Sequence, residues 1–385
     1  MINSKRALLV VCLIIVCFGL CRVSHAAKEP YKVGAIFSVT GPASWLGEPE
    51  RNTAQMIVDK VNAAGGINGH PIELIVYDTE GDETKSVLNA KKLIEKDKVL
   101  AIIGPSRSGS SLAIIPTINE AEVPNISCAA SVKIVSPVAE RKWVFKTPQS
   151  DSFCAESMFD YMLKKGITRV AIITVSNGFG DSGRTELLEA AKRMGITIVA
   201  DERYSGKDTD MTAQLTKIKG TNAQAIVNWS IGPTQVIVTK NVQQLGIKIP
   251  LFQSHGFGST KNIEQAGGAA EGVLAPIGRL LVADQLPEYH FQKKLLTDYQ
   301  NEYREKFGSD ASTFGGHAYD SMYMVIEALK AVGPDRAKIR DYIENMRGFT
   351  GTAGLFNFSP LDHNGLTKES FEVLTVKDGR FVIAD

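Results

Sequence analysis

A glycine-rich segment is the most suggestive chemical motif in the chain. Residues 178–183 read Gly-Phe-Gly-Asp-Ser-Gly, open a helical pattern and are followed by Asp201. This arrangement is typical of dinucleotide binding, in which glycines let the backbone approach a pyrophosphate. The two preceding residues, Ser176 and Asn177, make a looser turn than that motif needs. We therefore interpret the segment as a connection at the carboxyl end of a sheet, with an exported NAD-dependent oxidoreductase as the alternative.

A second loop, residues 104–111, also joins a predicted strand to a predicted helix. It lacks the lysine of a phosphate-binding P-loop, and Ser108 stands where the nucleophile elbow of a hydrolase has glycine. The loop offers hydroxyl groups beside the free N–H groups of a helix N-terminus, an arrangement that favours an anion. Ser108 is therefore either an anion ligand or a helix cap.

Metal binding and covalent catalysis have little support. The histidines after position 26 show no pair at ligand spacing, and the chain contains no Cys-x-x-Cys. We expect no metal site, no cofactor and no catalytic residue. The histidines concerned are His70, His255, His290, His317 and His363.

The composition is that of a globular protein with several domains. The chain has 385 residues, of which 44% are hydrophobic and 22% charged. This length suits two or three domains of ~100 to 200 residues each and excludes a disulfide-stabilised miniprotein. The net charge of +1 lacks the basic excess that nucleic acid selects, so we expect no nucleic-acid partner.

The N-terminus has the pattern of a secretory signal. Lys5 and Arg6 precede an apolar run at 7–20, and residues 24–26 (Ser-His-Ala) suit cleavage. The run is shorter than the ~20 residues that a spanning helix needs, so residues 1–26 predict export to the periplasm. Two questions about the cysteines stay open: lipidation of Cys21, and a disulfide in that oxidising compartment between Cys128 and Cys154.

Strand and helix patterns alternate along the rest of the chain. Strands are predicted at 31–39, 72–78, 99–104, 124–127, 169–175, 196–200, 223–229, 250–253, 371–376 and 381–383. Helices are predicted at 52–64, 84–96, 110–121, 185–194, 234–245, 288–307 and 313–331. This alternation predicts an α/β fold with parallel sheets covered by helices on both faces.

One strand, loop and helix plan occurs twice. The segments that begin at 99 and at 225 each pass through a Gly-Pro loop into a helix, and then into a strand preceded by proline. The repeat indicates two similar lobes. We expect the chain to leave the first lobe near 147, with Asp151 or Ser152 capping the next helix.

The chain resembles the periplasmic leucine/isoleucine/valine-type solute-binding proteins of ABC transporters. The resemblance covers essentially all of the chain after the signal. It is most specific at 61–69, Val-Asn-Ala-Ala-Gly-Gly-Ile-Asn-Gly. The other segments that carry it are 33–42, 103–108, 124–130, 177–180 and 356–365.

The resemblance implies a type I periplasmic binding fold. Two similar doubly wound lobes with parallel-rich sheets are then joined by three crossovers, near 147, 275 and 350. The N-terminal lobe would comprise 27–147 and 276–350. The C-terminal lobe would comprise 148–275 and 351–385.

The resemblance also implies how the ligand's carboxylate and body are held. Ser108 falls where the family binds the carboxylate, together with backbone and hydroxyl groups at Ala129 and Ser131. An aromatic residue that covers the ligand falls at Phe179.

The remaining site positions bear on specificity. Trp45 or Leu46 falls on the opposite wall, and Ile231 lies where the family often has another aromatic residue. Amino-acid binders hold the ligand's ammonium with an acid where this chain has His255. Either another acid such as Glu48 reaches the ammonium, or the ligand has none.

The expected function is capture and delivery without bond making. The resemblance implies a monomeric, extracytoplasmic component of a branched-chain-amino-acid-type ABC transporter that hands its ligand to a membrane permease. The ligand would be a small hydrophobic carboxylate, either a branched-chain or related amino acid or an aromatic or 2-oxo acid. A sensory receptor ectodomain of the same fold is the other possibility.

Overall fold

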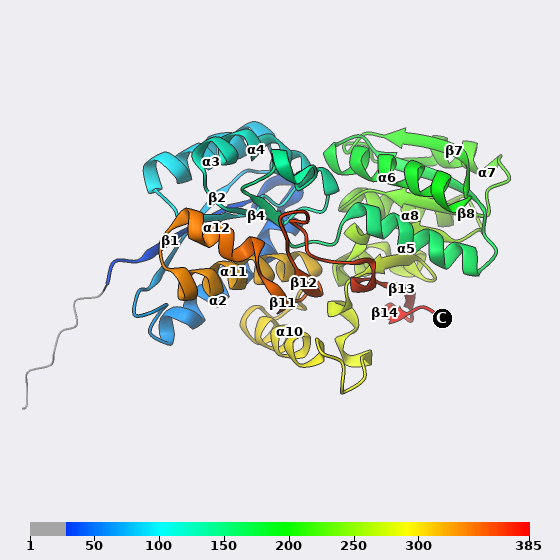
Figure 1. Ribbon diagram of the computed structural model, residues 1–385. Coiled ribbons are helices and arrows are strands. Elements are labelled where there is room, and N and C mark those ends of the chain that lie inside the picture. The colour runs from blue at the N-terminus through cyan, green and yellow to red at the C-terminus, as the bar shows by residue number, and fades with distance from the viewer. Residues whose placement is uncertain (1–27) are drawn as a thin grey trace, which may run out of the picture.

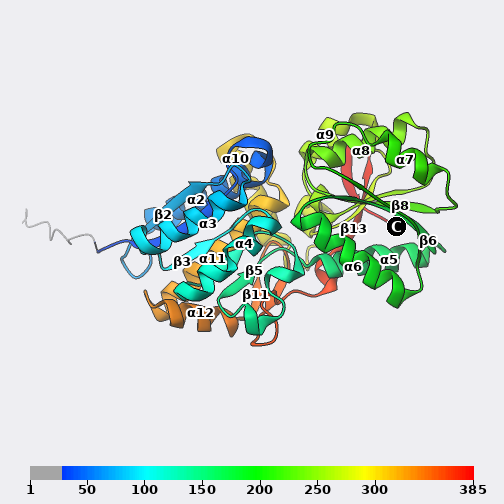
Figure 2. The same cartoon turned by 90° about the horizontal axis from the view of Figure 1, so that it is seen from above.

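The computed structural model describes residues 28–385, which form two lobes side by side (Figures 1 and 2). The predicted signal at 1–26 and Cys21 lie outside the described residues. Within 28–385, no helix combines the length and the apolar character needed to cross a membrane.

The N-terminal lobe is built on a five-stranded, fully parallel sheet in the order β2-β1-β3-β4-β5. Parallel strands are covered on both faces, which explains their continuous apolar sequences. Alternate side chains of β1 enter two different cores, with Val33 and Phe37 on one face and Ile36 on the other. The strands are β1 (Tyr31–Phe37), β2 (Ile72–Asp78), β3 (Ala101–Ile103), β4 (Asn125–Ser127) and β5 (Val144–Lys146).

Helices cover both faces of this sheet (Figure 2). Helices α2 (Ser44–Ala63) and α11 (Thr313–Val332) pack against each other on one face. Helices α3 (Glu83–Lys92) and α4 (Ser108–Ala121) cover the other. The lobe also contains α10 (Lys293–Phe307), α12 (Arg336–Glu344), β11 (Arg347–Thr350) and β12 (Leu355–Asn357).

The C-terminal lobe contains a seven-stranded sheet in the order β14-β13-β10-β9-β8-β6-β7. Five neighbouring strands, β10, β9, β8, β6 and β7, run parallel to one another. Strands β13 and β14 add an antiparallel edge. The strands are β6 (Arg169–Val175), β7 (Thr197–Tyr204), β8 (Ala225–Trp229), β9 (Leu251–Gln253), β10 (Leu274–Ile277), β13 (Glu372–Lys377) and β14 (Arg380–Ile383). The helices are α5 (Asp151–Lys164), α6 (Gly178–Met194), α7 (Thr212–Lys219), α8 (Pro233–Gln244) and α9 (Thr260–Ala266).

The chain passes between the lobes after β5, after β10 and after β12. The last passage lies later than the predicted boundary at 350, because Phe356, Phe358 and Leu366 pack in the core of the N-terminal lobe. The ring of Phe358 meets that of Phe145 edge to face, with centroids 5.7 Å apart. Residues 351–366 therefore belong with the N-terminal lobe.

Several local expectations also change. The helix predicted from 288 begins at Lys293, and the cap of α5 is Ser150 rather than Asp151 or Ser152. The two cysteines of the described chain, Cys128 and Cys154, are buried free thiols.

Candidate ligand-binding site

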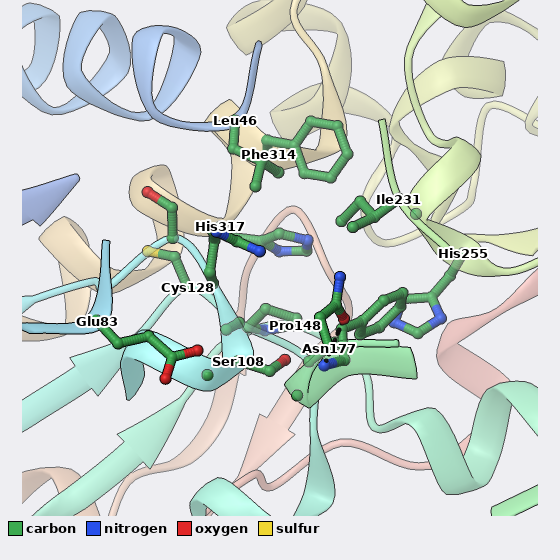
Figure 3. A pocket seen from close by; sticks show the side chains of 18 residues that line it. Leu46, Glu83, Ser108, Cys128, Pro148, Asn177, Ile231, His255, Phe314 and His317 are labelled. Carbon is green, nitrogen blue, oxygen red and sulfur yellow. Dashed lines mark hydrogen bonds between the residues drawn. The ribbon is translucent and has the colours of Figure 1, made fainter. Parts of the chain in front are cut away.

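A pocket lies between the lobes (Figure 3). Its atom-free space of about 580 Å³ includes space that is open to solvent. The N-terminal lobe contributes Leu46, Glu83, 106–109, 128–130, Phe314 and His317. The C-terminal lobe contributes 177–179, Ile231, His255 and Gly256, and Pro148 lies in the first crossing.

The N-terminus of α4 faces this pocket without a side-chain cap. Ser108 is the first residue of the helix, and the preceding Arg107 makes no capping bond. The Arg107 guanidinium donates instead to the carbonyl of Gly81, at 2.6 Å. The Ser108 hydroxyl accepts from the N–H of Ser131 at 3.4 Å, so it does not cap α4. An uncapped N-terminus combines free donors with the positive end of the helix dipole, which favours a bound anion.

The N-terminus of α6 is already capped. Asn177 Oδ1 accepts from the N–H groups of Phe179 and Gly180, both at 3.0 Å. The predicted helix start at 185 is therefore too late, because the glycine-rich segment itself forms the first turns of α6.

Packing explains the glycines of that segment. A side chain at Gly180 would collide with the carbonyl of Val175, and one at Gly183 would collide with the ring of Trp229. Asp201, the residue expected to hold a ribose in the dinucleotide interpretation, is paired with Arg184, whose Nε lies 2.9 Å from Oδ1. The spacing of the glycines in residues 178–183 therefore reflects close contact between helix α6 and its sheet.

Six of the eight predicted site residues line the pocket: Leu46, Ser108, Ala129, Phe179, Ile231 and His255. Trp45 does not line the pocket. Its indole nitrogen donates to the carbonyl of Pro42 at 3.1 Å. Its ring instead packs edge to face on Phe314, with centroids 5.2 Å apart. Phe314 provides the aromatic wall in its place.

Ser131 also lies outside the lining. Its hydroxyl is 2.6 Å from that of Ser182 in the other lobe. The neighbouring Val132 N–H donates to Asp151 Oδ1 at 2.9 Å. On the far side of the cleft, Thr313 N and Oγ1 donate to the carbonyl of Gly258 at 3.2 and 2.9 Å. Ser131 therefore belongs to a set of contacts that joins the lobes around the pocket.

The walls of the pocket are largely apolar. Leu46 and Phe314 form a small cluster against which Ile231 of the other lobe packs. Phe179 closes the side next to His255, with ring centroids 5.5 Å apart. Figure 3 shows Leu46 and Phe314 with Ile231 around the same cavity. Such walls suit a hydrophobic ligand body.

Two buried histidines line the pocket, one from each lobe. His255 is 8% exposed and His317 is 7% exposed. Burial lowers the pKa of each to about 3, and the nearby Lys146 ammonium adds to this. Both rings are therefore neutral at pH 7. Burial also lowers the pKa of Lys146 to about 7, and its Nζ donates to the carbonyl of Pro148 at 2.7 Å.

Acidic side chains are scarce in the lining. Of the described residues that line the pocket, Glu83 alone is acidic, and it is exposed beside Gly109. Glu50 lies behind the wall, where it accepts from the Ser106 hydroxyl, and burial raises the pKa of its carboxyl well above the usual range. Glu48 is exposed and outside the lining.

The comparisons with known proteins agree with the fold. The family model described as periplasmic binding protein matches residues 30–380. The chain is 24% identical over 315 residues to the leucine-, isoleucine-, valine-, threonine- and alanine-binding protein of Pseudomonas aeruginosa, covering 80% of each chain.

Solved structures show the same architecture. An extracellular ligand-binding receptor from Rhodopseudomonas palustris HaA2 matches with a TM-score of 0.87 and 30% identity, over 92% of this chain and 99% of that one. The substrate-binding protein of a branched-chain amino acid transporter from Streptococcus pneumoniae, in complex with isoleucine, matches with a TM-score of 0.81 and 26% identity, over 92% and 99%. The chain has the type I periplasmic binding fold and belongs to the periplasmic binding protein family.

Proposed function

We propose that this chain is the extracytoplasmic solute-binding component of an ABC transporter and captures a small hydrophobic monocarboxylate between its lobes. The observation that carries the proposal is the uncapped N-terminus of α4 at Ser108, which faces a pocket with apolar walls from both lobes. The names of the relatives support the transporter role, since the Streptococcus pneumoniae protein is described as part of one.

The ligand carboxylate would lie at the first turn of α4. Each charge-assisted hydrogen bond from a backbone N–H or from the Ser108 hydroxyl contributes about 1.5 to 3 kcal/mol when water is excluded. Leu46 and Phe314 on one side, and Phe179 and Ile231 on the other, enclose the apolar body. Closing the lobes removes water, and opening them releases the unchanged ligand to a permease.

Titration calorimetry tests this function. Leucine, 4-methyl-2-oxopentanoate and benzoate each supply a carboxylate on a compact apolar body. We expect saturable binding of at least one of them, with one site per chain. Absence of binding by all three, or saturable binding of NAD instead, would contradict the proposed function.

A further inference from the structure

Three ring nitrogens beside the pocket are buried without a hydrogen-bond partner in the described chain. They are Nδ1 and Nε2 of His255 and Nδ1 of His317. Both rings line the cavity, His255 from the C-terminal lobe and His317 from α11 of the N-terminal lobe (Figure 3). Buried polar atoms in native proteins nearly always have partners, and a ligand in the adjoining pocket is one source of partners for these three nitrogens.

The chemistry of a neutral imidazole defines the group that fits. Each ring has one N–H donor and one acceptor nitrogen. A hydroxyl group can donate to an acceptor nitrogen or accept from an N–H, and a carbonyl oxygen can accept from an N–H, so either can pair with one of these three ring nitrogens. The aromatic rings of Trp229 and Phe371 pack edge-on against His255, each with centroids 5.7 Å away, and hold it in place.

An ammonium group fits the same position poorly. It brings three donors and no acceptor, and its charge needs a negative partner when water is excluded. The positive end of α4 lies at this pocket and supplies no negative partner. Glu50 lies outside the lining and binds Ser106 through one carboxyl oxygen, and burial raises the pKa of this carboxyl, which favours its uncharged form. Glu83, exposed beside Gly109, is the remaining candidate.

We propose that His255 and His317 recognise an uncharged oxygen substituent of the ligand, so that the ligand is a hydroxy- or oxo-substituted hydrophobic carboxylate rather than an α-amino acid. This inference rests on the proposed function, because the carboxylate is taken to lie at α4. It assigns the two histidines as specificity-determining residues.

The test compares acids that differ only in the substituent. The aliphatic series is 4-methylpentanoate, its 2-hydroxy and 2-oxo derivatives, and leucine; the aromatic pair is benzoate and 4-hydroxybenzoate. We expect at least one oxygen-substituted acid to bind at least tenfold more tightly than its plain parent, and the 2-oxo acid to bind more tightly than leucine.

Variants connect that preference to the two rings. His255→Phe and His317→Phe keep an aromatic side chain and remove the ring nitrogens. Each is expected to reduce, at least fivefold, the ratio of affinities between the oxygen-substituted acid and its plain parent. His290→Phe, before α10 and outside the pocket, is the matched control and should change neither affinity.

The outcomes separate the two proposals. Equal binding of plain and substituted acids, or a preference that survives both substitutions, overturns the inference and leaves the proposed function intact. Tightest binding of leucine, lost in Glu83→Gln, also overturns it and assigns the ammonium to Glu83. Failure of every acid to bind contradicts the proposed function itself.

Discussion

Gly109 at the start of α4 and Gly178 at the start of α6 meet backbone to backbone across the two lobes. A Cβ atom built on Gly178 would lie 3.0 Å from both the nitrogen and the Cα of Gly109, closer than such contacts ordinarily are. The positive ends of two helix dipoles thus converge beside the pocket. Asn177 caps α6, whereas no side chain caps α4, so an anion bound at α4 relieves this unfavourable arrangement.

Substitution of Gly178 should impair closure without unfolding the protein. In Gly178→Val, the added methyl groups would meet the backbone of Gly109 when the lobes close. We expect ligand affinity in calorimetry to fall at least tenfold while the melting temperature of the ligand-free protein changes little. Gly206→Ala is the control, because a Cβ there meets a single atom, at 3.7 Å. Wild-type affinity in Gly178→Val would refute the role of this contact.

Ser108 provides a direct test of carboxylate binding. Ser108→Ala removes a hydroxyl at the first residue of α4, which should cost about 1.5 to 3 kcal/mol, or roughly ten- to a hundredfold in affinity. The same titration with Ser205→Ala, an exposed serine outside the pocket lining, should give the wild-type value. Unchanged affinity in Ser108→Ala would show that the hydroxyl does not bind the ligand.

Acid should destabilise the protein through the two buried histidines. Both are neutral in the folded state because burial lowers the pKa of each to about 3, whereas the unfolded chain protonates them below about 6.5. Each therefore reduces the free energy of unfolding by up to about 1.4 kcal/mol per pH unit as the pH falls from 6.5 towards 3.

Urea unfolding at pH 7 and pH 5 measures this effect in wild type and in the His255→Phe, His317→Phe double variant. Burial raises the pKa of Asp320 and of Glu186 to about 7, which acts in the opposite direction, but their contributions cancel in the comparison. The double variant should lose less stability at pH 5 than wild type. An equal loss would show that these rings are not buried and neutral.

Site residues that follow a strand directly are predicted better from the sequence than site residues that reach the pocket from a distant helix. Leu46, Ser108 and Phe179 follow strands whose carboxyl ends face the cleft, so local pattern and family resemblance place them correctly. Phe314 and His317 were not predicted. They lie at the start of α11, and nothing in the local pattern of that helix shows that its first turns return to the pocket.

Errors at element boundaries have local causes. Helix α2 begins at Ser44 rather than at the predicted residue 52, and it contains Pro49, although proline ordinarily disfavours a helix interior. Of the residues in the first turn of this helix, Leu46 lines the cavity and Trp45 does not. The crossover predicted at 350 lies after Leu366, since the hairpin of β11 and β12 packs its phenylalanines into the N-terminal lobe.

Ligand binding should make the molecule more compact. The structure has the lobes joined by Ser131 with Ser182 and by Thr313 with Gly258, contacts that an open form would lack. We expect the radius of gyration from small-angle scattering to fall when a binding acid is added in excess. In Gly178→Val, the radius of gyration should fall by a smaller amount when the same acid is added. A radius that stays constant at saturation in wild type would contradict capture by closure.

Binding of a carboxylate at the N-terminus of α4 can be tested by comparing an acid with its own methyl ester. The ester keeps the apolar body and removes the charge that the helix end stabilises. For the tightest of the acids titrated above, we expect the acid to bind at least a hundredfold more tightly than its ester, and Ser108→Ala to reduce this ratio. Equal affinities for acid and ester in calorimetry would show that no carboxylate binds at this helix end.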